Sequence, residues 1–199
     1  MQYPKTPENE AQRLEALRSL DILDTSAEER FDRLTRLARR MFDVPIAVVS
    51  LVDADRQWFK SRDGLDTEQT PREISFCGHA ILDDAVFIVP DALRDERFAD
   101  NPLVTGDPHI RFYAGCPIKH LDGSRLGAFC IIDREPRVMD EEAVENLRDL
   151  ARLAERELAA VQLATLDDLT RISNRRGFAL LAQKSLNICA RHDVPASLV

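Results

Sequence analysis

The spacing of hydrophobic residues predicts helices at both ends of the chain and strands between them. Residues 7–20 carry several charges, with Leu14 and Leu17 on one side, which is typical of a surface helix. A stronger helix follows, because Thr25 or Ser26 can cap its start with a glutamate three residues later. Its apolar residues recur at the helical period and are expected to face a core: Phe31, Leu34, Leu37, Ala38 and Met41.

Residues 44–64 change to the pattern of strands. A run rich in valine ends at Val52, residues 53–56 form a polar turn, and an extended run then resumes. This pattern predicts a β-hairpin. Residues 110–136 predict a second hairpin around Asp122 and Gly123, a dipeptide that tolerates the positive φ angles of such turns.

Shorter elements are expected between the hairpins. Residues 74–84 predict a short helix opened by Ser75, residues 85–92 a strand, and residues 93–109 a turn-rich segment with one short helix. Residues 139–166 predict a long helix. The order α-α-β-β-α-β-α-β-β-α favours the α+β class, with an antiparallel sheet and its helices on one face.

The second hairpin leaves two registers open. A three-residue turn would place Cys116 opposite Cys130, near disulfide range, whereas a two-residue turn would place Cys116 opposite Phe129. We expect Cys116 and Cys130 to be reduced, buried and apolar in character. The best candidate for a single reactive thiol is Cys77, near the start of a helix.

Composition narrows the class of protein. The chain has 199 residues, of which 44% are hydrophobic and 31% charged, and it has no run long enough to cross a membrane. Without an apolar leader at its start, a cytoplasmic location is expected. A net charge of −8 argues against nucleic acid as a partner. The four cysteines form no C-x-x-C pair, so neither zinc nor another metal is expected.

Four segments carry a resemblance to a known family. They are "AVVSLVDADRQWFKS", "REISFCGHAIL", "FADNPLVTGDPHIRFYAGCPI" and "GSRLGAFCIIDREPR". In order and spacing they resemble a bacterial GAF domain, a small-molecule sensor fold. The resemblance implies a GAF domain over residues 25–160, preceded by an N-terminal helix within 1–24. The last helix, 139–166, would run on as a signalling linker.

A second resemblance lies near the end of the chain. "DDLTRISNRRGF" resembles the opening of a GGDEF domain, the diguanylate cyclase that makes cyclic di-GMP from GTP. Residues 167–199 would then be the N-terminal fragment of that domain, in which the resemblance gives Asn174 a guanine contact. The alternative for Asn174 is the cap of a helix. The simplest interpretation is a longer protein cut shortly inside its output domain, with natural truncation as the alternative.

The chain as given is expected to be inactive as a cyclase. The loop that names the GGDEF family and the carboxylates that hold magnesium are absent from the sequence, and phosphoryl transfer relies on both. GTP and magnesium would therefore matter only to a complete GGDEF domain.

The ligand pocket of a GAF domain lies between the sheet and the connecting helices and loops. The candidate lining residues here are Trp58, Phe59, Ser75, Cys77, His79, Arg111, Tyr113 and Asp133. Trp58 and Phe59 point to opposite faces, so at most one can face the cavity. No resident cofactor is evident: Cys77 and His79 are not adjacent as bilin attachment would need, haem would have His79 as its one obvious ligand, and two ligands do not complete a zinc site.

Residues 144–165 show a heptad-like stripe that predicts a homodimer. Steps of three and four connect Val144, Leu147, Ala151, Ala154, Leu158, Val161 and Thr165. Leu150 and Leu153 fall outside this stripe and are expected to pack back on the sheet. The alternative is that the stripe is core packing of a single helix.

These patterns lead to one function and two alternatives. The chain is expected to be the regulatory, small-molecule-sensing module of a bacterial diguanylate cyclase, which passes the state of an unknown ligand through a dimeric helix to a GGDEF output domain. The alternatives are a thiol redox sensor and a GAF-type enzyme such as free methionine sulfoxide reductase.

Overall fold

A computed structural model describes residues 1–165 and, beyond them, 178, 181–182, 185–186, 189 and 194–195. Its elements in chain order are α1 (Glu10–Ser19), α2 (Glu29–Phe42), β1 (Ile46–Val52), β2 (Arg56–Asp63), β3 (Gln69–Pro71), the 3-10 helix η1 (Arg72–Ile74), α3 (Phe76–Ala80), β4 (Phe87–Val89), α4 (Pro102–Thr105), β5 (Phe112–Lys119), β6 (Arg125–Asp133) and α5 (Glu141–Thr165).

The strands form one six-stranded sheet in the order β3-β2-β1-β6-β5-β4, and every neighbouring pair is antiparallel. Both predicted hairpins are present, as β1–β2 and β5–β6. In the second, Gly123 has the positive φ of 86° that its turn requires. Cys116 lies opposite Phe129, which is the second of the two expected registers, and Gly115 lies opposite Cys130.

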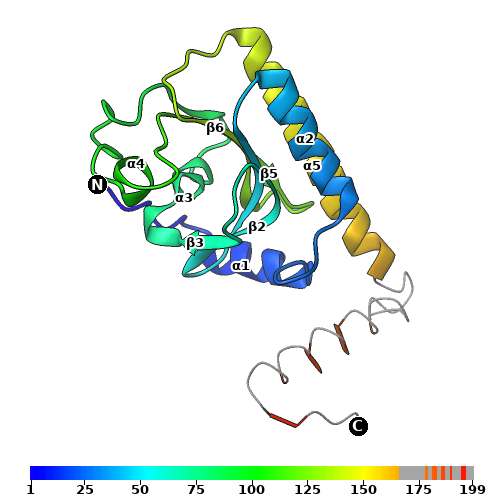
Figure 1. The fold of residues 1–199 in the computed structure, drawn as a ribbon. Helices are drawn as coiled ribbons and strands as arrows, with labels where there is room; N and C mark the ends of the chain where they lie inside the picture. The colour runs from blue at the N-terminus through cyan, green and yellow to red at the C-terminus, as the bar shows by residue number, and fades with distance from the viewer. Residues whose placement is uncertain (166–177, 179–180, 183–184, 187–188, 190–193, 196–199) are drawn as a thin grey trace.

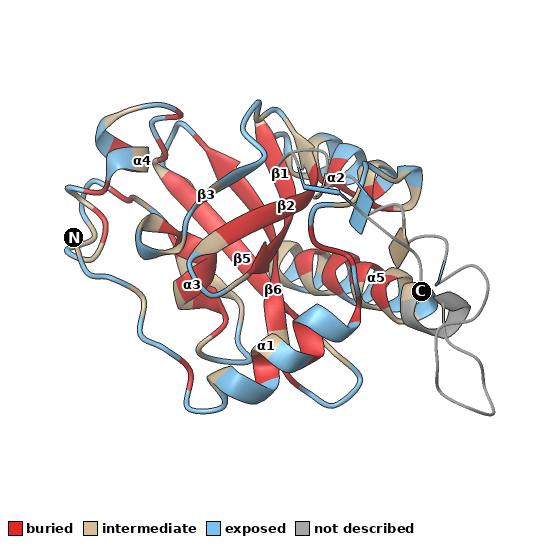
Figure 2. Ribbon diagram, turned by 90° about the horizontal axis from the view of Figure 1, so that it is seen from below, coloured by how far each residue is buried: buried red, intermediate tan, exposed pale blue. Residues whose placement is uncertain are grey.

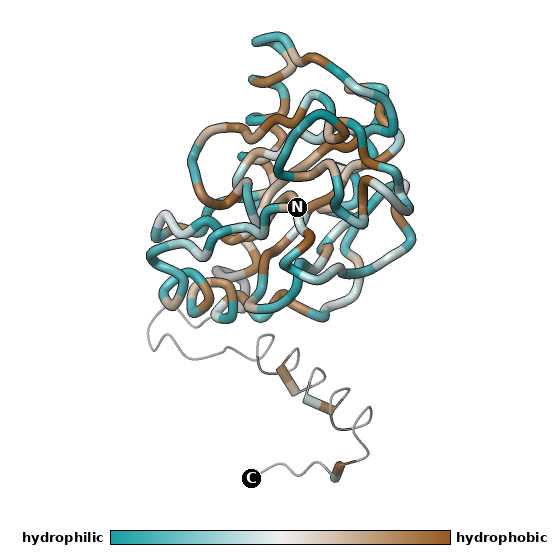
Figure 3. Tube along the Cα trace, turned by 90° about the vertical axis from the view of Figure 1, so that its left-hand side faces the viewer, coloured by the Kyte–Doolittle hydropathy of each residue, from teal (hydrophilic) through white to brown (hydrophobic). Residues whose placement is uncertain are grey.

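Helices cover both faces of the sheet, whereas the sequence predicted them on one. On one face α1, α2 and α5 pack over a core, and on the other α3, α4 and the connecting loops cover a second core (Figure 1). All seven residues of β1 are buried, and Figure 2 shows how completely the central strands are enclosed. A strand that is apolar at successive positions is suited to this, because both of its faces need cover. The hydrophilic residues lie mainly along the outer loops and turns (Figure 3).

Helix α2 buries a narrower stripe than its sequence predicted. Phe31, Leu34 and Ala38 are buried, but Leu37 and Met41 are 46% and 48% exposed. Counting about 100° per residue, Leu37 lies roughly 90–110° and Met41 roughly 50–70° from the centre of the buried stripe. The helix therefore presents part of its apolar surface to solvent.

The predicted N-cap of α2 is not formed. The residue before the helix is Glu28, whose side chain makes no capping hydrogen bond. The Thr25 hydroxyl instead donates to the Ile22 carbonyl and accepts from Lys60 Nζ at 2.8 Å. Lys60 requires this partner because its ammonium group is buried, where it also pairs with Glu28.

The stripe along α5 faces the chain's own core and not a helix of a second copy. Leu147, Ala151, Ala154 and Leu158 are buried there, and Val161 packs against the same core. The alternative of core packing is thus confirmed, because α5 lies on β5, β6 and α2. Leu150 is buried as expected. In contrast, Leu153 does not pack back on the sheet and is 40% exposed.

The short strand β3 was not predicted. It pairs residues 69–71 with the start of β2, so that Gln57 lies opposite Thr70. Three residues are too few for an alternating pattern to be recognised. The pairing matters because it brings Thr70 to the edge of the cavity described next.

Candidate functional site

A cavity of about 390 Å³ lies on the sheet face that α3 and α4 cover. Its apolar wall is made by Val48, Phe59, Leu65, Phe76, Leu103, Ile110 and Ile132. The remaining lining residues include Gln57, Asp66, Thr67, Thr70, Asp107 and Arg134, together with Cys77, Tyr113 and Cys130. A mostly apolar cavity with a few polar groups is the usual form of a small-molecule site.

Strand β2 contributes to this cavity through its alternation. Gln57 and Phe59 line the cavity, while Trp58 packs in the core on the opposite face. Beyond Phe59 the register with β1 shifts, because Val49 pairs with Ser61 and Ser50 pairs with Phe59. Lys60 is the additional residue of this bulge. Its side chain turns toward Glu28, on the same side as Trp58 and away from the cavity.

One end of the cavity carries polar atoms that lack partners. Gln57 Oε1 and Thr70 Oγ1 are buried and, among the described residues, meet no hydrogen-bond partner. The whole Gln57 side chain is only 5% exposed. Buried polar groups are nearly always paired, and an unpaired one costs about 1–3 kcal/mol. A molecule in the cavity that donates a hydrogen bond to Gln57 would remove this cost, once a small movement of the side chain exposes the buried oxygen.

A second group of polar atoms lies deeper in the wall. The Sγ atoms of Cys77 and Cys130 are 3.7 Å apart, and the Tyr113 hydroxyl donates to Cys77 Sγ at 3.2 Å. The hydrogen bond with Cys130 is the largest influence on the pKa of Cys77 and lowers it, although burial opposes this. Burial raises the pKa of Cys130 and of Tyr113 well above their ordinary values. Cys77 thus accepts from Tyr113 and is the sulfur of the pair whose pKa is lowered.

Gly115 makes room for the Tyr113 ring. A Cβ at Gly115 would lie 2.2 Å from the Tyr113 hydroxyl oxygen and 2.7 Å from the ring carbon that carries it. Any larger residue at position 115 would therefore displace Tyr113 from its hydrogen bond with Cys77.

Three of the eight predicted pocket residues line the cavity: Phe59, Cys77 and Tyr113. Trp58 does not, since it belongs to the opposite core. Ser75 is buried as the N-cap of α3, where its hydroxyl accepts from the Gly78 amide at 2.9 Å. This cap confirms the predicted start of the short helix.

The other three predicted residues have structural partners outside the cavity. The His79 ring stacks edge-on against Phe98 and contacts the Gln2 carbonyl at 3.2 Å. Arg111 donates to the carbonyls of Val104 and Ile110. Asp133 pairs with Arg137 and accepts from two backbone amides after β6.

Several lining residues escaped the sequence analysis. Gln57 shares a face with Phe59 at a spacing of two, a signal that was available. Val48 and Cys130 are opposite each other on β1 and β6. Once the strand order is known, placing one of them at the cavity therefore predicts that the other lies there too. Asp66, Asp107 and Arg134 lie in loops, where no period predicts which way a side chain points.

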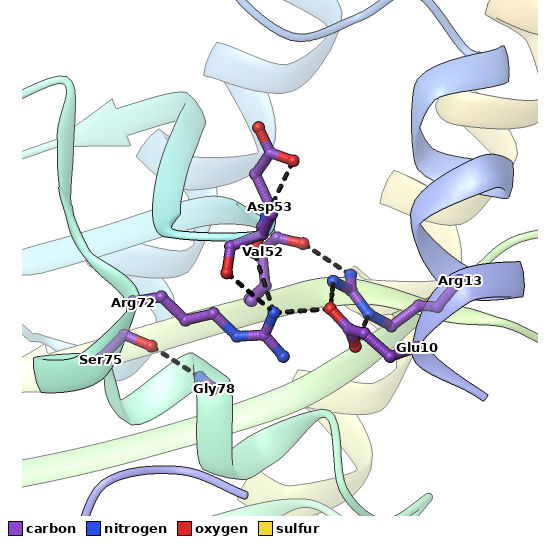
Figure 4. Close-up of polar contacts among 8 residues, drawn as sticks. Glu10, Arg13, Val52, Asp53, Arg72, Ser75 and Gly78 are labelled. Atoms are coloured by element: carbon purple, nitrogen blue, oxygen red, sulfur yellow. Dashed lines mark hydrogen bonds and ion pairs between the residues drawn. The ribbon is translucent and has the colours of Figure 1, made fainter. Parts of the chain in front are cut away.

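An ionic cluster joins α1 to η1 and to the end of β1 (Figure 4). Arg13 is 1% exposed, donates to both Glu10 carboxylate oxygens and reaches the Val52 carbonyl at 2.6 Å. Arg72, from η1, donates to Glu10 and to the Asp53 carbonyl. Burial alone would raise the pKa of Glu10, but the two arginines lower it to about 2.

Two further findings concern only the part of the chain that the structure describes. No group of three or more His, Cys, Asp or Glu side chains is placed to hold a metal ion there. No helix there is long and apolar enough to span a bilayer. Asn174, the predicted guanine contact, lies outside the described residues, as does most of 167–199.

Comparisons with known proteins place this geometry in a family. A cyclic di-GMP phosphodiesterase of Pseudomonas aeruginosa is 43% identical over 177 residues, which cover 88% of this chain but only 30% of the phosphodiesterase. The chain thus spans less than a third of the length of this curated relative.

Two solved structures show the same fold. The free methionine-R-sulfoxide reductase of Neisseria meningitidis, in complex with its substrate, has a TM-score of 0.57 at 17% identity, covering 82% of this chain and 98% of that one. The GAF domain of the Acinetobacter phosphoenolpyruvate-protein phosphotransferase has a TM-score of 0.55 at 16% identity, covering 76% and 96%. Identities this low show the fold alone. The GAF domain family model matches residues 26–158, the segment that holds the sheet and the cavity, and the chain therefore belongs to the GAF domain family.

Proposed function

We propose that the chain is the small-molecule-sensing module of a protein of cyclic di-GMP signalling. The observation that carries the sensing role is the unpartnered oxygen of Gln57, a residue that lines a mostly apolar cavity. The signalling context is supported by the phosphodiesterase relative, which is named for cyclic di-GMP. A cytoplasmic location is part of the proposal, because the cyclase substrate is GTP.

The ligand class follows from the cavity walls. Phe59, Leu103 and Ile110 favour a compact, largely apolar body, while Gln57 and Thr70 favour a hydrogen-bond donor at one end. A volume of about 390 Å³ is at the small end of the range for drug-sized ligands. We therefore expect a small metabolite of this kind and not a large pigment.

The output domain is proposed from the sequence motif. "DDLTRISNRRGF" would open a GGDEF domain over 167–199, with Asn174 as its guanine contact. In its complete form this domain would bind GTP and magnesium and make cyclic di-GMP. The reading frame beyond codon 199 should then encode the Gly-Gly-Asp/Glu-Glu-Phe loop. A frame that stops there or encodes an unrelated domain would remove the cyclase from the proposal.

Ligand binding can be tested at Gln57. In a thermal-shift screen of small metabolites, a compound that fills the cavity should raise the melting temperature of the parent chain. Gln57→Leu should weaken its binding about tenfold or more, because the donor of the compound would lose its acceptor. Isothermal titration of the parent and the variant measures this change.

The matched control is Gln12→Leu, the same substitution at an exposed position on α1. It should leave the affinity unchanged. A screen without a stabilising compound, or a compound that binds Gln57→Leu as tightly as the parent, would contradict the sensing role of this cavity.

A homodimer is also part of the proposal, but through a different face from the one predicted. Because the heptad-like stripe of α5 is used inside the chain, a second copy would have to pack elsewhere. Leu37 and Met41 of α2 and Leu153 of α5 are exposed together. Arg33 and Glu157 form an ion pair beside them at 2.6 Å. A second copy on this α2–α5 face could place two cyclase domains around two GTP molecules.

The double variant Leu37→Glu and Leu153→Glu should therefore be monomeric in light scattering, because association would bury unpaired charges. Leu93→Glu is the control, since Leu93 is 48% exposed in a loop away from both helices. It should leave the parent's dimer intact. A monomeric parent, or a double variant that remains dimeric, would show that this face is not the interface.

A further inference from the structure

Two cysteines from elements far apart in the sequence meet in the cavity wall. Cys77 belongs to α3 and Cys130 to β6, and their Sγ atoms are 3.7 Å apart. Both side chains are buried and both line the cavity. One of the two expected registers placed Cys116 opposite Cys130, but Cys116 points to the opposite face of the sheet and packs in the other core. The cavity thus holds a pair of thiols at van der Waals contact.

The pair is chemically unequal. Cys77 Sγ accepts a hydrogen bond from the Tyr113 hydroxyl and shares another with Cys130 Sγ, and the contact with Cys130 most strongly lowers the pKa of Cys77. Cys130 has a raised pKa because it is buried, and so does Tyr113, which therefore remains a donor. A thiolate is the nucleophilic form of cysteine, so Cys77 is the attacking sulfur and Cys130 the resolving one.

We propose that Cys77 and Cys130 form a two-electron redox site in which a small hydroperoxide that enters the cavity oxidises the pair to a disulfide. The Cys77 thiolate attacks the peroxide, forming an S–O bond as the O–O bond breaks, and an alcohol or water leaves with a proton. The Cys130 sulfur then attacks Cys77, forming the S–S bond as the S–O bond breaks, and water leaves with the Cys130 proton. In sum, two thiols and one hydroperoxide give one disulfide, one alcohol or water, and one further water.

This site would link redox state to the shape of the cavity. A disulfide needs an S–S separation of about 2.05 Å, so the two sulfurs must approach by roughly 1.7 Å. The movement would draw α3 and β6 together at the wall formed by Cys77 and Tyr113. The inference goes beyond the proposed ligand sensing and does not depend on the identity of the sensed ligand.

Cys116 provides an internal comparison. It is buried like the pair but has no thiol partner, and burial raises its pKa to about 11. At neutral pH it is therefore protonated and a poor nucleophile. Burial alone does not make a cysteine of this chain reactive. A difference in reactivity between Cys116 and Cys77 would therefore come from the groups that surround each thiol.

The test begins with the freshly reduced parent chain and hydrogen peroxide. Intact mass should fall by two hydrogens, dithiothreitol should reverse the loss, and peptide mapping should link Cys77 to Cys130. Absence of that loss, oxygen added to either sulfur without a cross-link, or a link through another cysteine would overturn the proposal. Because this measurement uses the parent chain, it decides the matter even if a cysteine variant fails to fold.

Variants then separate the roles. Cys77→Ser and Cys130→Ser should each abolish the two-hydrogen loss, whereas Cys116→Ser should form the disulfide at the parent's rate. Tyr113→Phe keeps the ring but removes the donor to Cys77, and it should slow disulfide formation about tenfold. Circular dichroism establishes that each variant is folded. A Cys77→Ser variant that still loses two hydrogens would refute the assigned pair, and an unchanged rate in Tyr113→Phe would refute the role of Tyr113.

Discussion

Alanine in place of Gly127 should lower the free energy of unfolding by about 3 kcal/mol or more. Gly127 lies in β6 and pairs with Leu51 of β1 and Ile118 of β5. A Cβ at this position would lie 1.9 Å from the Ser50 carbonyl oxygen and 2.8 Å from Leu51 Cα. Both are backbone atoms of a central strand, so no side chain can rotate to make space. The β1–β6 pairing would have to open, at the centre of the sheet.

Gly123→Ala is the matched control in the neighbouring turn. Gly123 has a φ of 86°, but a Cβ there meets nothing within 4 Å. The cost should be about 1 kcal/mol, from the backbone conformation alone. Urea unfolding followed by circular dichroism compares the two variants. If their unfolding free energies differ by less than about 1 kcal/mol, close backbone approach is not what requires glycine at 127.

The two hairpins could be predicted because their signals are local. Strand-forming runs flank a polar turn at 53–55 and a turn that contains Gly123, and the antiparallel pairing follows directly. The short helix after Ser75 was predictable for the same reason, since its cap is a contact between residues three apart. In each case the residues that determine the element lie within it.

The packing partners of helices could not be predicted in this way. The period of α5 shows that Leu147, Ala151 and Leu158 share a face, but it does not show whether a sheet or a second helix covers that face. The structure places the chain's own sheet there. The same limit applies to α2, where Leu37 and Met41 fit the helical period and are nevertheless exposed.

The site was predictable in its elements but not in its contacts. Alternation alone indicates that Phe59 and Trp58 face opposite ways, yet only the strand order shows which of them faces the cavity. The contact between Cys77 and Cys130 spans 53 positions, and no local pattern indicates it. Charged candidates such as Asp133 were poor guides because nearby groups, here Arg137, satisfy them.

Arg13→Met should destabilise the chain by about 2–3 kcal/mol at neutral pH. The substitution preserves much of the volume of a fully buried side chain but removes its charge and its donors. Glu10 would lose two hydrogen bonds, and the Val52 carbonyl would lose one (Figure 4). Arg72 remains beside Glu10, which keeps the cost below that of an isolated buried carboxylate. Arg18→Met, at an exposed position of the same helix, should change stability by less than about 0.5 kcal/mol.

The pH dependence of this difference identifies Glu10 as the partner that matters. Burial would raise the pKa of Glu10, but hydrogen bonds and charges from Arg13 and Arg72 lower it from 4.5 to about 2 in the folded chain. A lowered folded pKa means that the ionised carboxylate stabilises the fold above about pH 4.5, and that this contribution is lost as the pH falls toward 2.

Arg13→Met moves the pKa of Glu10 back toward its ordinary value. The stability gap between parent and variant should therefore be complete at pH 7 and should narrow from about pH 4.5 downward, leaving mainly the lost bond to Val52. Urea unfolding at pH 7 and pH 3 measures both gaps, and equal gaps would show that the Arg13–Glu10 pair contributes little.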